Sequence, residues 1–403
     1  MRTVTAFFVS IWLLSLPFYN ISIWRTLSVD NILAPIAFAF STLLLFSSPR
    51  LAGKANLLVC VGFFYVFFAI GYLLSVADSH TYLQSASLQI AKYAVYFFTP
   101  ILFVRSIRDV RIVAKMLAAA AILAGVSAFL VSLGFLELAV SRTSPGRLSF
   151  IGLPKSIGLM GNYGDVAMLF AATWILMRVF RAYNAPLASR PVEYLVLGAL
   201  VIGFLGSQSR NIALTFLASA STYFALSLTV GKTRGRGLLM PMLLVLLLVA
   251  VPGVVVVSDV NLVEEVSNWG GQQARGTAED RVSQYQYALR LILENPFLGD
   301  GEAIARSGMQ IHNIWLNVAA NGGVVAGLGL LGMMLCCFAT AFIRMLRDKS
   351  KGMGLASMSI FVATAIATEF YVGLTYTFFI VLGTALVMPL VSFEKSNGPR
   401  PGI

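Results

Sequence analysis

Residues 312–338 read HNIWLNVAANGGVVAGLGLLGMMLCCF, a polar His-Asn pair followed by an almost entirely apolar run. The run is long enough to cross a lipid bilayer as one helix, which needs roughly 20 apolar residues. Backbone polar groups inside a bilayer must be satisfied within the protein, so such a run favours a helix. His312 and Asn313 therefore stand where a polar loop meets the membrane.

Apolar runs of this kind recur along the chain. Hydrophobic residues make up 58% of the sequence, charged residues only 11%, and the mean hydropathy is +0.83, which excludes an ordinary soluble domain. The pattern predicts an all-α, polytopic integral membrane bundle formed by one domain, residues 1–393, with residues 394–403 as a disordered tail. The first run lacks a small-residue cleavage site, so we expect it to remain as a span. We count about twelve transmembrane runs: Val4–Tyr19, Asn31–Ser47, Leu57–Val76, Leu88–Val104, Ile112–Leu133, Tyr163–Phe180, Val192–Leu205, Ile212–Val230, Leu238–Val257, Ile314–Phe338, Leu355–Thr368 and Thr375–Val391.

Basic residues are distributed unevenly between the two sides of such a bundle. The formal net charge is +12. If the predicted runs all span the membrane, alternate loops collect most of the Lys and Arg residues, and both termini lie on that basic side. The positive-inside rule then places both termini in the cytoplasm. The basic excess reports membrane topology, so we expect no nucleic-acid partner.

Residues that commonly hold metals or cofactors are scarce. The chain has two histidines and three cysteines. Cys60, Cys336 and Cys337 all fall inside apolar runs, so we expect them to be core or lipid-facing residues. The sequence contains no phosphate-binding loop and no dinucleotide fingerprint. It therefore predicts no metal site and no cofactor.

Two outward loops are longer than simple connections. The first, Gly134–Asn162, is rich in Gly and Ser and carries Arg147. The second, Ser258–Ile311, runs about fifty residues, which exceeds the usual length of a plain connector.

The second loop has a readable internal pattern. Thr277 followed by Asp280 resembles a capping box, which places Arg281 in the first turn of a helix. Pro296 ends that helix, and Gly299-Asp300-Gly301 is predicted to be a turn. The helix is expected to be amphipathic and to lie against the membrane surface or the bundle. Its apolar stripe comprises Val282, Tyr285, Leu289 and Ile292.

Two arginines are candidates for anion binding. Arg210 is wedged between two apolar runs, where a charge is costly unless it is paired or used. A guanidinium binds phosphate oxygens through two parallel hydrogen bonds and keeps its charge at any working pH. Arg281, near a helix N-terminus, would be mildly unfavourable for the helix dipole, which favours a specific anionic partner. The alternatives are that Arg210 snorkels to lipid headgroups and that Arg281 is a solvated surface residue.

His312 is the candidate for proton handling. A helix N-terminus and nearby arginines disfavour imidazolium, so we expect a neutral ring that can accept a proton near pH 7. The alternative is an interfacial histidine with a structural hydrogen bond. Asn313, Asn317 and Asn321 follow at intervals of four residues and are expected to line one face of the next span. These amides could bind sugar hydroxyls or satisfy one another.

Several of these residues form a pattern that resembles the bacterial family of O-antigen ligases and O-antigen or exopolysaccharide polymerases. The resemblance covers residues 146–332, whereas the first five spans agree only in hydropathy. Gly323 fits the family's Gly-x-x-small pattern, and Ala326 in the last place is a mild departure. Two further landmarks are similar, at Ser207–Arg210 and at Gly161-Asn162-Tyr163. The signature itself is carried by Arg281, Ala288-Leu289, Glu294-Asn295-Pro296-Phe297-Leu298-Gly299-Asp300-Gly301, His312-Asn313-Ile314-Trp315-Leu316 and Gly322-Gly323.

The resemblance implies a metal-independent, inverting glycosyltransferase on the periplasmic face of the bacterial inner membrane. The implied donor is a glycan on undecaprenyl pyrophosphate, and the acceptor is a lipid-linked glycan or the lipid A core. Arg210 and Arg281 would hold the pyrophosphate, and His312 would activate or position the acceptor hydroxyl. Membrane lipids, a chain-length regulator and a flippase are the further partners implied. Candidates for acceptor or sugar binding are Asn313, Asn317 and Arg147.

The motif is shared by two kinds of enzyme, and other classes also use many spans. A polymerase transfers the growing chain onto the next lipid-linked repeat unit, whereas an O-antigen ligase transfers a finished chain to the lipid A core. We favour the polymerase, since polymerases are the broader group. A transporter or flippase would show polar residues deep in several spans and a two-fold repeat, and neither is evident. A structural role in an export complex would leave the arginines and His312 unexplained.

Overall fold

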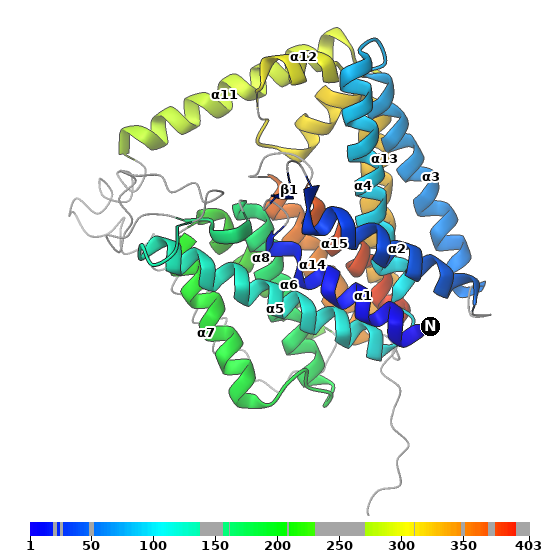
Figure 1. Cartoon of the computed structure of the whole chain (residues 1–403), viewed down its shortest axis with the longest axis vertical. Coiled ribbons are helices and arrows are strands. Elements are labelled where there is room, and N and C mark those ends of the chain that lie inside the picture. Colours follow the sequence, from blue (N-terminus) through cyan, green and yellow to red (C-terminus); the bar gives the residue numbers. More distant parts are fainter. Residues whose placement is uncertain are drawn as a thin grey trace, which may run out of the picture.

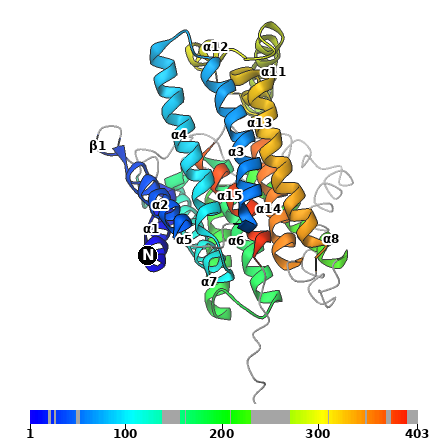
Figure 2. The same ribbon diagram turned by 90° about the vertical axis from the view of Figure 1, so that its right-hand side faces the viewer.

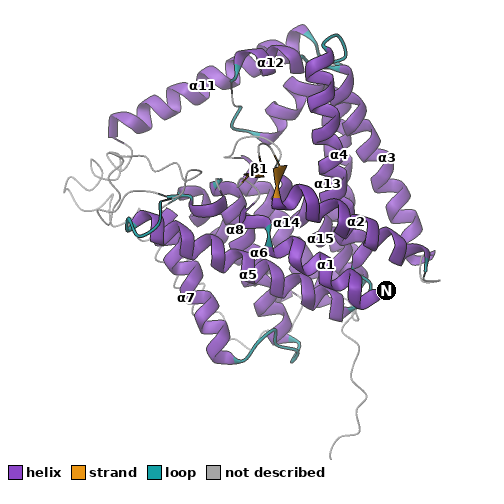
Figure 3. Ribbon diagram, in the orientation of Figure 1, coloured by secondary structure: helices purple, strands orange, loops and turns teal. Residues whose placement is uncertain are grey.

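A computed structural model describes residues 1–18, 22–24, 27–47, 52–137, 156–160, 162–207, 209–229, 271–309, 311–347, 351–369 and 375–391. The regular secondary structure of this part is helical apart from β1 and β2, which form one short antiparallel pair (Figure 3). Three single turns of 3-10 helix interrupt the loops. The elements are α1 (Arg2–Leu14), η1 (Leu16–Phe18), β1 (Ser22–Trp24), β2 (Leu27–Ser28), α2 (Val29–Phe46), α3 (Ala52–Leu74), α4 (His80–Phe103), α5 (Ile107–Ser132), η3 (Gly158–Met160), α6 (Tyr163–Ala182), α7 (Arg190–Ser207), α8 (Arg210–Thr229), α11 (Gly271–Glu294), α12 (Gly301–Ser307), α13 (Ile314–Met345), α14 (Lys351–Glu369), α15 (Tyr376–Val387) and η5 (Met388–Leu390).

Eight of the described helices are long and apolar enough to cross a membrane: α2, α3, α5, α6, α7, α8, α13 and α14. Two shorter apolar helices are α1 and α15, the latter continuing into η5. Every predicted run except Leu238–Val257 coincides with a described helix, and that run lies outside the described residues. The prediction of a multi-pass membrane protein is confirmed, while the number of twelve spans stays a prediction.

The end of the bundle that holds Arg2 and Lys54 lies opposite the helices α11 and α12 (Figure 2). Arg2 forms an ion pair of 2.9 Å with Asp109, and the Lys54 amine donates to the Ile101 carbonyl at 3.1 Å. The starts of α1, α3 and α5 therefore lie together at one end. At the other end, Gly301 at the start of α12 lies against the segment that follows α3. Figure 2 shows α3, α4 and α13 side by side, with α11 and α12 across their far end.

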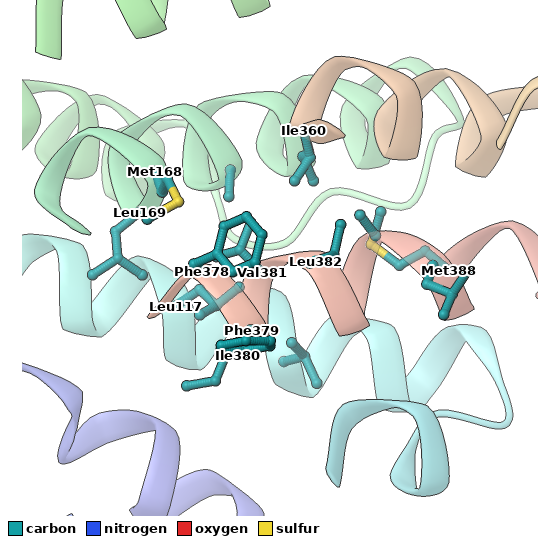
Figure 4. Close-up of a cluster of buried hydrophobic side chains, with 14 of the residues drawn as sticks. Leu117, Met168, Leu169, Ile360, Phe378, Phe379, Ile380, Val381, Leu382 and Met388 are labelled. Carbon is teal, nitrogen blue, oxygen red and sulfur yellow. The ribbon is translucent and has the colours of Figure 1, made fainter. Parts of the chain in front are cut away.

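The centre of the bundle is α15. All of its residues from Thr377 to Val387 are buried, which is expected for a helix that is apolar on every side. Figure 4 shows the surrounding side chains, with Leu117 of α5, Met168 of α6 and Ile360 of α14 facing it. Because α15 is short, its outer end stops inside the bundle rather than at the level of α11 (Figure 1).

A sharp bend divides α13. Gly323 has φ 64° and ψ −166°, which is not helical, so residues 314–322 and 324–345 form two helical parts. Figure 1 shows the first part rising towards α12 and the second part descending beside α3. The predicted run from Ile314 to Phe338 lies within α13, but the helix is bent at Gly323 rather than continuous. A Cβ atom at Gly323 would lie 2.2 Å from the Phe297 carbonyl oxygen, so only glycine permits this approach.

The second part of α13 packs closely on α3 through small residues. A Cβ atom at Gly71 would lie 2.5 Å from the Ala326 nitrogen, and one at Gly329 would lie 2.3 Å from the Phe68 nitrogen. In a membrane, where no hydrophobic driving force joins helices, such close backbone contact is what holds them together. The contact with α3 therefore requires a small residue at position 326, because a side chain larger than that of Ala326 would push α3 away.

The cysteines lie where apolar runs were predicted to place them, and two of them meet. The sulfur atoms of Cys60 on α3 and Cys336 on α13 are 3.5 Å apart, and Cys337 is buried. This contact joins α3 and α13 on the same face as the small residues.

Candidate functional site

His312 lies in the short segment between α12 and α13. Its neighbours Ile311 and Ile314 are both 0% exposed, so the segment is anchored on either side. Ile311 packs with the small hydrophobic cluster of α11 and α12, whereas Ile314 belongs to the main core of the bundle. His312 therefore lies between the helical bundle and the outer helices α11 and α12, and its position at the membrane surface stays a prediction.

Asn313 starts α13 as its N-cap. Its backbone is extended, with φ −156° and ψ 127°, and its side-chain oxygen accepts from the Leu316 amide at 3.0 Å. This is the usual way in which an asparagine satisfies a free amide in the first turn of a helix. The prediction that a helix begins directly after His312-Asn313 is confirmed. The side-chain oxygen of Asn313 is therefore used for capping the helix, and the binding of a sugar by Asn313 stays a prediction.

The two following asparagines lie on the first part of α13. The Asn321 amide donates to the Asn317 backbone oxygen at 2.8 Å and to its side-chain oxygen at 3.3 Å. Tyr72 on α3 also donates to the Asn317 side chain, at 3.5 Å. The asparagines thus bond partly to each other, which is one of the two alternatives, and they lie before the bend rather than along a full span.

Tyr285 fixes the His312 segment to α11. Its hydroxyl donates to the His312 backbone oxygen at 3.2 Å. Two residues further along, the Tyr287 hydroxyl donates to the Ala303 carbonyl at 3.2 Å and so holds α12. Sequence reasoning named Tyr285 only as part of an apolar stripe. The spacing of four residues between Arg281 and Tyr285 could have indicated that the two lie on the same face of one helix.

The start of α11 differs from the prediction. The helix begins at Gly271, so Thr277 and Asp280 lie inside it and do not form a capping box at its start. Arg281 therefore lies in the middle of α11 rather than in its first turn, and the argument from the helix dipole no longer applies. Four of the six residues of α11 before Thr277 are Gln, Ala or Arg, which favour a helix, and they extend it despite Gly271 and Gly276.

The apolar stripe of α11 is also divided. Tyr285 and Ile292 are partly buried, but Val282 and Leu289 are 54% and 49% exposed. The face turned towards α12 and α13 instead centres on Ala288 and Leu291, which are 0% and 4% exposed. Pro296 follows the end of α11 at Glu294, as predicted, but Gly299-Asp300-Gly301 leads into α12, with Asp300 as its N-cap.

Arg281 shares a helix face with Tyr285 by its spacing of four residues. Its side chain, the Arg210 side chain and all of Arg147 lie outside the described atoms. Arg210 is the first residue of α8, and the next residue, Asn211, donates to the Ala367 carbonyl of α14 at 3.1 Å. The described contacts therefore link Arg281's helix to His312, and they link the start of α8 to the end of α14.

A buried carboxylate that the sequence reasoning missed lies at the start of α6. Asp165 is 0% exposed, and its Oδ1 atom accepts from the Thr375 hydroxyl at 2.6 Å. Asn162 caps the same helix by accepting from the Gly164 and Asp165 amides at 2.7 and 3.2 Å. A carboxylate this deep needs such partners. The sequence could have indicated Asp165, because it comes three residues after Asn162, close to the Gly161-Asn162-Tyr163 landmark.

Among the described residues, no group of three or more His, Cys, Asp or Glu side chains could hold a metal ion.

The chain is thus a multi-pass helical membrane protein in which one outer segment, His312-Asn313, is fixed between the bundle and two outer helices. Residues 195–331 match the model of a protein family described as O-antigen ligase, which confirms the predicted resemblance to the O-antigen ligase and polymerase family. The match runs from α7 to the middle of α13, so it includes Arg210, Arg281 and His312 but not the landmark at Gly161–Tyr163. A comparison with curated proteins found no match.

Proposed function

We propose that the protein is a membrane glycosyltransferase that transfers a glycan from undecaprenyl pyrophosphate to a hydroxyl acceptor. The favoured reaction is the polymerisation of lipid-linked repeat units of an exopolysaccharide or O-antigen, and ligation to the lipid A core is the alternative. The observation that carries the proposal is the fixed position of His312, between an N-capped helix and the Tyr285 hydroxyl. That segment lies inside the part of the chain that matches the O-antigen ligase family.

The chemistry is a single displacement with inversion. The acceptor oxygen bonds to the anomeric carbon, and the bond from that carbon to the pyrophosphate oxygen breaks with its electron pair. His312 takes or aligns the proton of the acceptor hydroxyl. Arg210 and Arg281 stabilise the charge that develops on the leaving pyrophosphate. The energy of the reaction lies in the activated lipid, so the mechanism uses no nucleotide, and the two arginines supply the positive charge that a metal ion would otherwise provide.

Three features of the described residues support these roles. Arg281 lies one helical turn from Tyr285, on the face of α11 that holds the His312 segment. Arg210 is the first residue of α8, a candidate membrane span, and a charged residue at such a position is usually paired or functional. Asn317 lies on the first part of α13, close to His312, and we retain it with Asn313 and Arg147 as a candidate for sugar binding.

The topology proposed is that of a bacterial inner-membrane protein with both termini in the cytoplasm. The end of the bundle that holds the Arg2–Asp109 pair and Lys54 is the basic end, which the positive-inside rule assigns to the cytoplasm. The His312 segment, at the level of α11 and α12, then faces the periplasm. The membrane domain, residues 1–393, acts on lipid-linked glycans there, alongside a flippase and a chain-length regulator.

The experiment uses the purified full-length chain in liposomes with a lipid-linked repeat unit and a strong chelator. Offering a second lipid-linked unit should give longer chains, and offering lipid A core instead should give no product. The reverse result would identify a ligase. No glycan transfer with either acceptor, together with movement of the lipid between leaflets, would reject the glycosyltransferase in favour of a transporter.

A further inference from the structure

A polar stripe follows one face of α4. Thr81, Ser85, Gln89, Lys92 and Tyr96 recur at intervals of three or four residues, so they lie on the same side of the helix. Their exposure declines in order along the chain: Thr81, Ser85 and Gln89 are exposed, Lys92 is partly buried, and Tyr96 is 1% exposed. The stripe therefore leads from the outer end of the bundle into its interior.

Neighbouring α3 has the opposite character. Over the same outer half of the bundle its exposed large side chains are apolar, including Phe63, Phe67 and Leu74 at 57%, 36% and 49% exposure. These suit contact with lipid chains. Since α3 and α4 are adjacent antiparallel helices, the polar stripe of α4 serves some purpose other than facing lipid (Figure 2).

Lys92 is the only cation in that stripe, and among the described residues no carboxylate forms an ion pair with it. Its amine lies 5.8 Å from the centre of the Tyr376 ring, and none of the ion pairs formed among the described residues includes it. Two buried acids on adjoining elements have other donors. Asp30 accepts from the hydroxyls of Ser28 and Tyr96, and Asp165 accepts from Thr375.

A partly buried ammonium that has no carboxylate partner among the described residues loses part of its hydration, and a tyrosine ring offsets only part of that cost. Such residues in membrane proteins usually mark a substrate path. An ammonium has three hydrogens to donate and no acceptor, so the natural occupant beside Lys92 is an anion.

The Lys92 site is separated from the His312 side of the molecule by aromatic rings. The Tyr376 ring contacts Tyr93 at 5.8 Å, Tyr93 contacts Phe68 at 6.5 Å, and Phe68 contacts Tyr72 at 4.9 Å. Tyr72 then donates to Asn317, on the first part of α13. Four aromatic rings, those of Tyr376, Tyr93, Phe68 and Tyr72, thus lie between Lys92 and Asn317.

We propose that Lys92 and the polar stripe of α4 form a second anion-binding site, which holds an anionic group of a lipid-linked glycan. The group is a lipid phosphate or pyrophosphate, or the carboxylate of an acidic sugar. This inference rests on the proposed function: a polymerase binds two lipid-linked glycans at once and so needs a place for two anionic groups. The site at Arg210 and Arg281 would hold one, and Lys92 the other.

The test compares Lys92→Gln, Lys92→Arg and, as a matched control, Lys115→Gln on the exposed surface of α5. Each full-length variant is placed in nanodiscs, and binding is measured for two probes. One is undecaprenyl pyrophosphate carrying a neutral disaccharide, and the other is a lipid-free oligosaccharide that contains a uronic acid. Removing one charged hydrogen-bond partner should weaken binding of one probe roughly 10- to 100-fold. Lys92→Arg should retain most of the affinity, and Lys115→Gln all of it.

The probe that loses affinity identifies the anion as the lipid phosphate or as the sugar carboxylate. Unchanged binding of both probes by Lys92→Gln would overturn the inference. Lys92→Met, which keeps the length of the side chain, gives the same comparison if the Gln variant does not fold. A wild-type protein that binds a probe but transfers no glycan would reject the proposed function alone. Normal transfer and normal binding in Lys92→Gln would reject only the second site.

Discussion

The Tyr285 hydroxyl donates a hydrogen bond of 3.2 Å to the backbone carbonyl of His312, and it ties α11 to the segment that begins α13. The bond crosses 27 positions of sequence, so it sets the place of His312 relative to the helix that carries Arg281. Positioning of catalytic groups can be worth several powers of ten in rate, and small displacements are costly.

Tyr285→Phe should reduce the rate of glycan transfer while the protein stays folded. One neutral hydrogen bond contributes roughly 0.5–1.5 kcal/mol, so we expect a loss of about three- to tenfold in kcat. Tyr287→Phe is the matched control, because its hydroxyl holds α12 at Ala303 rather than the His312 segment. Equal rates for the two variants would show that the Tyr285 bond does not position His312.

His312→Ala should abolish transfer and leave binding of the lipid donor largely intact, since the arginines still hold the pyrophosphate. General-base assistance is usually worth about 10²–10⁴ in rate. His312→Gln separates two roles, because Gln can hydrogen-bond but is a poor base. An inactive Gln variant that binds donor supports proton transfer, and an active one supports positioning. Normal polymer from His312→Ala would make His312 a structural residue.

Arg210→Lys and Arg281→Lys should each lower the transfer rate by roughly 10²–10³, because an ammonium cannot reproduce two parallel hydrogen bonds to a phosphate. Arg290→Lys is the control on α11, since Arg290 is 64% exposed and pairs only loosely with Glu294 at 3.9 Å. Rates are measured with purified variants of equal thermal stability. Near-normal rates for both test variants would make these arginines membrane anchors.

Gly323→Ala should destabilise the protein strongly. Gly323 has φ +64°, and an added Cβ would meet the Phe297 carbonyl at 2.2 Å, so either the bend or the segment after α11 must move. We expect a loss of more than about 2 kcal/mol, seen as a lower midpoint of thermal unfolding in detergent. Gly327→Ala, where nothing lies within 4 Å of the added atom, should be neutral or slightly stabilising. Similar unfolding midpoints for the two variants would contradict the bend.

Mild oxidation of membranes should join Cys60 to Cys336, because their sulfur atoms are 3.5 Å apart. With a protease site placed in a loop between α3 and α13, the product is visible as two fragments that separate only after reduction. Cys60→Ser should prevent the cross-link, and Cys337→Ser should not, because Cys337 faces the core. No cross-link in the wild-type protein would mean that α3 and α13 are packed differently.

Much of the architecture follows from local patterns in the chain. Long apolar runs dictate membrane helices because an unpaired backbone group is intolerable in lipid, and all the runs that fall in described residues do form helices. The helix start at Asn313 follows from local chemistry too, because a cap bonds to an amide three residues away. The family resemblance and its match rest on the same kind of short-range motif.

Other features depended on contacts between distant segments. The bend at Gly323 requires Phe297 to lie against it, and the role of Ala326 requires Gly71 of α3, neither of which is visible in a single run. The helix α11 begins at Gly271, before the predicted capping box at Thr277 and Asp280. Two local signals conflict there: the capping pattern predicts a helix start at Thr277, whereas the Gln, Ala and Arg residues before it favour a helix.

The sequence by itself determined that this is a multi-pass helical membrane protein and that His312-Asn313 begins a helix at its surface, because hydropathy and capping act over a few residues. Only the tertiary structure decided that α13 folds back on itself, that Tyr285 holds His312, and that Asp165 is buried against Thr375. These depend on which helices become neighbours. That choice is made by close packing of small residues and by hydrogen bonds between remote positions, and it leaves no periodic trace in the sequence.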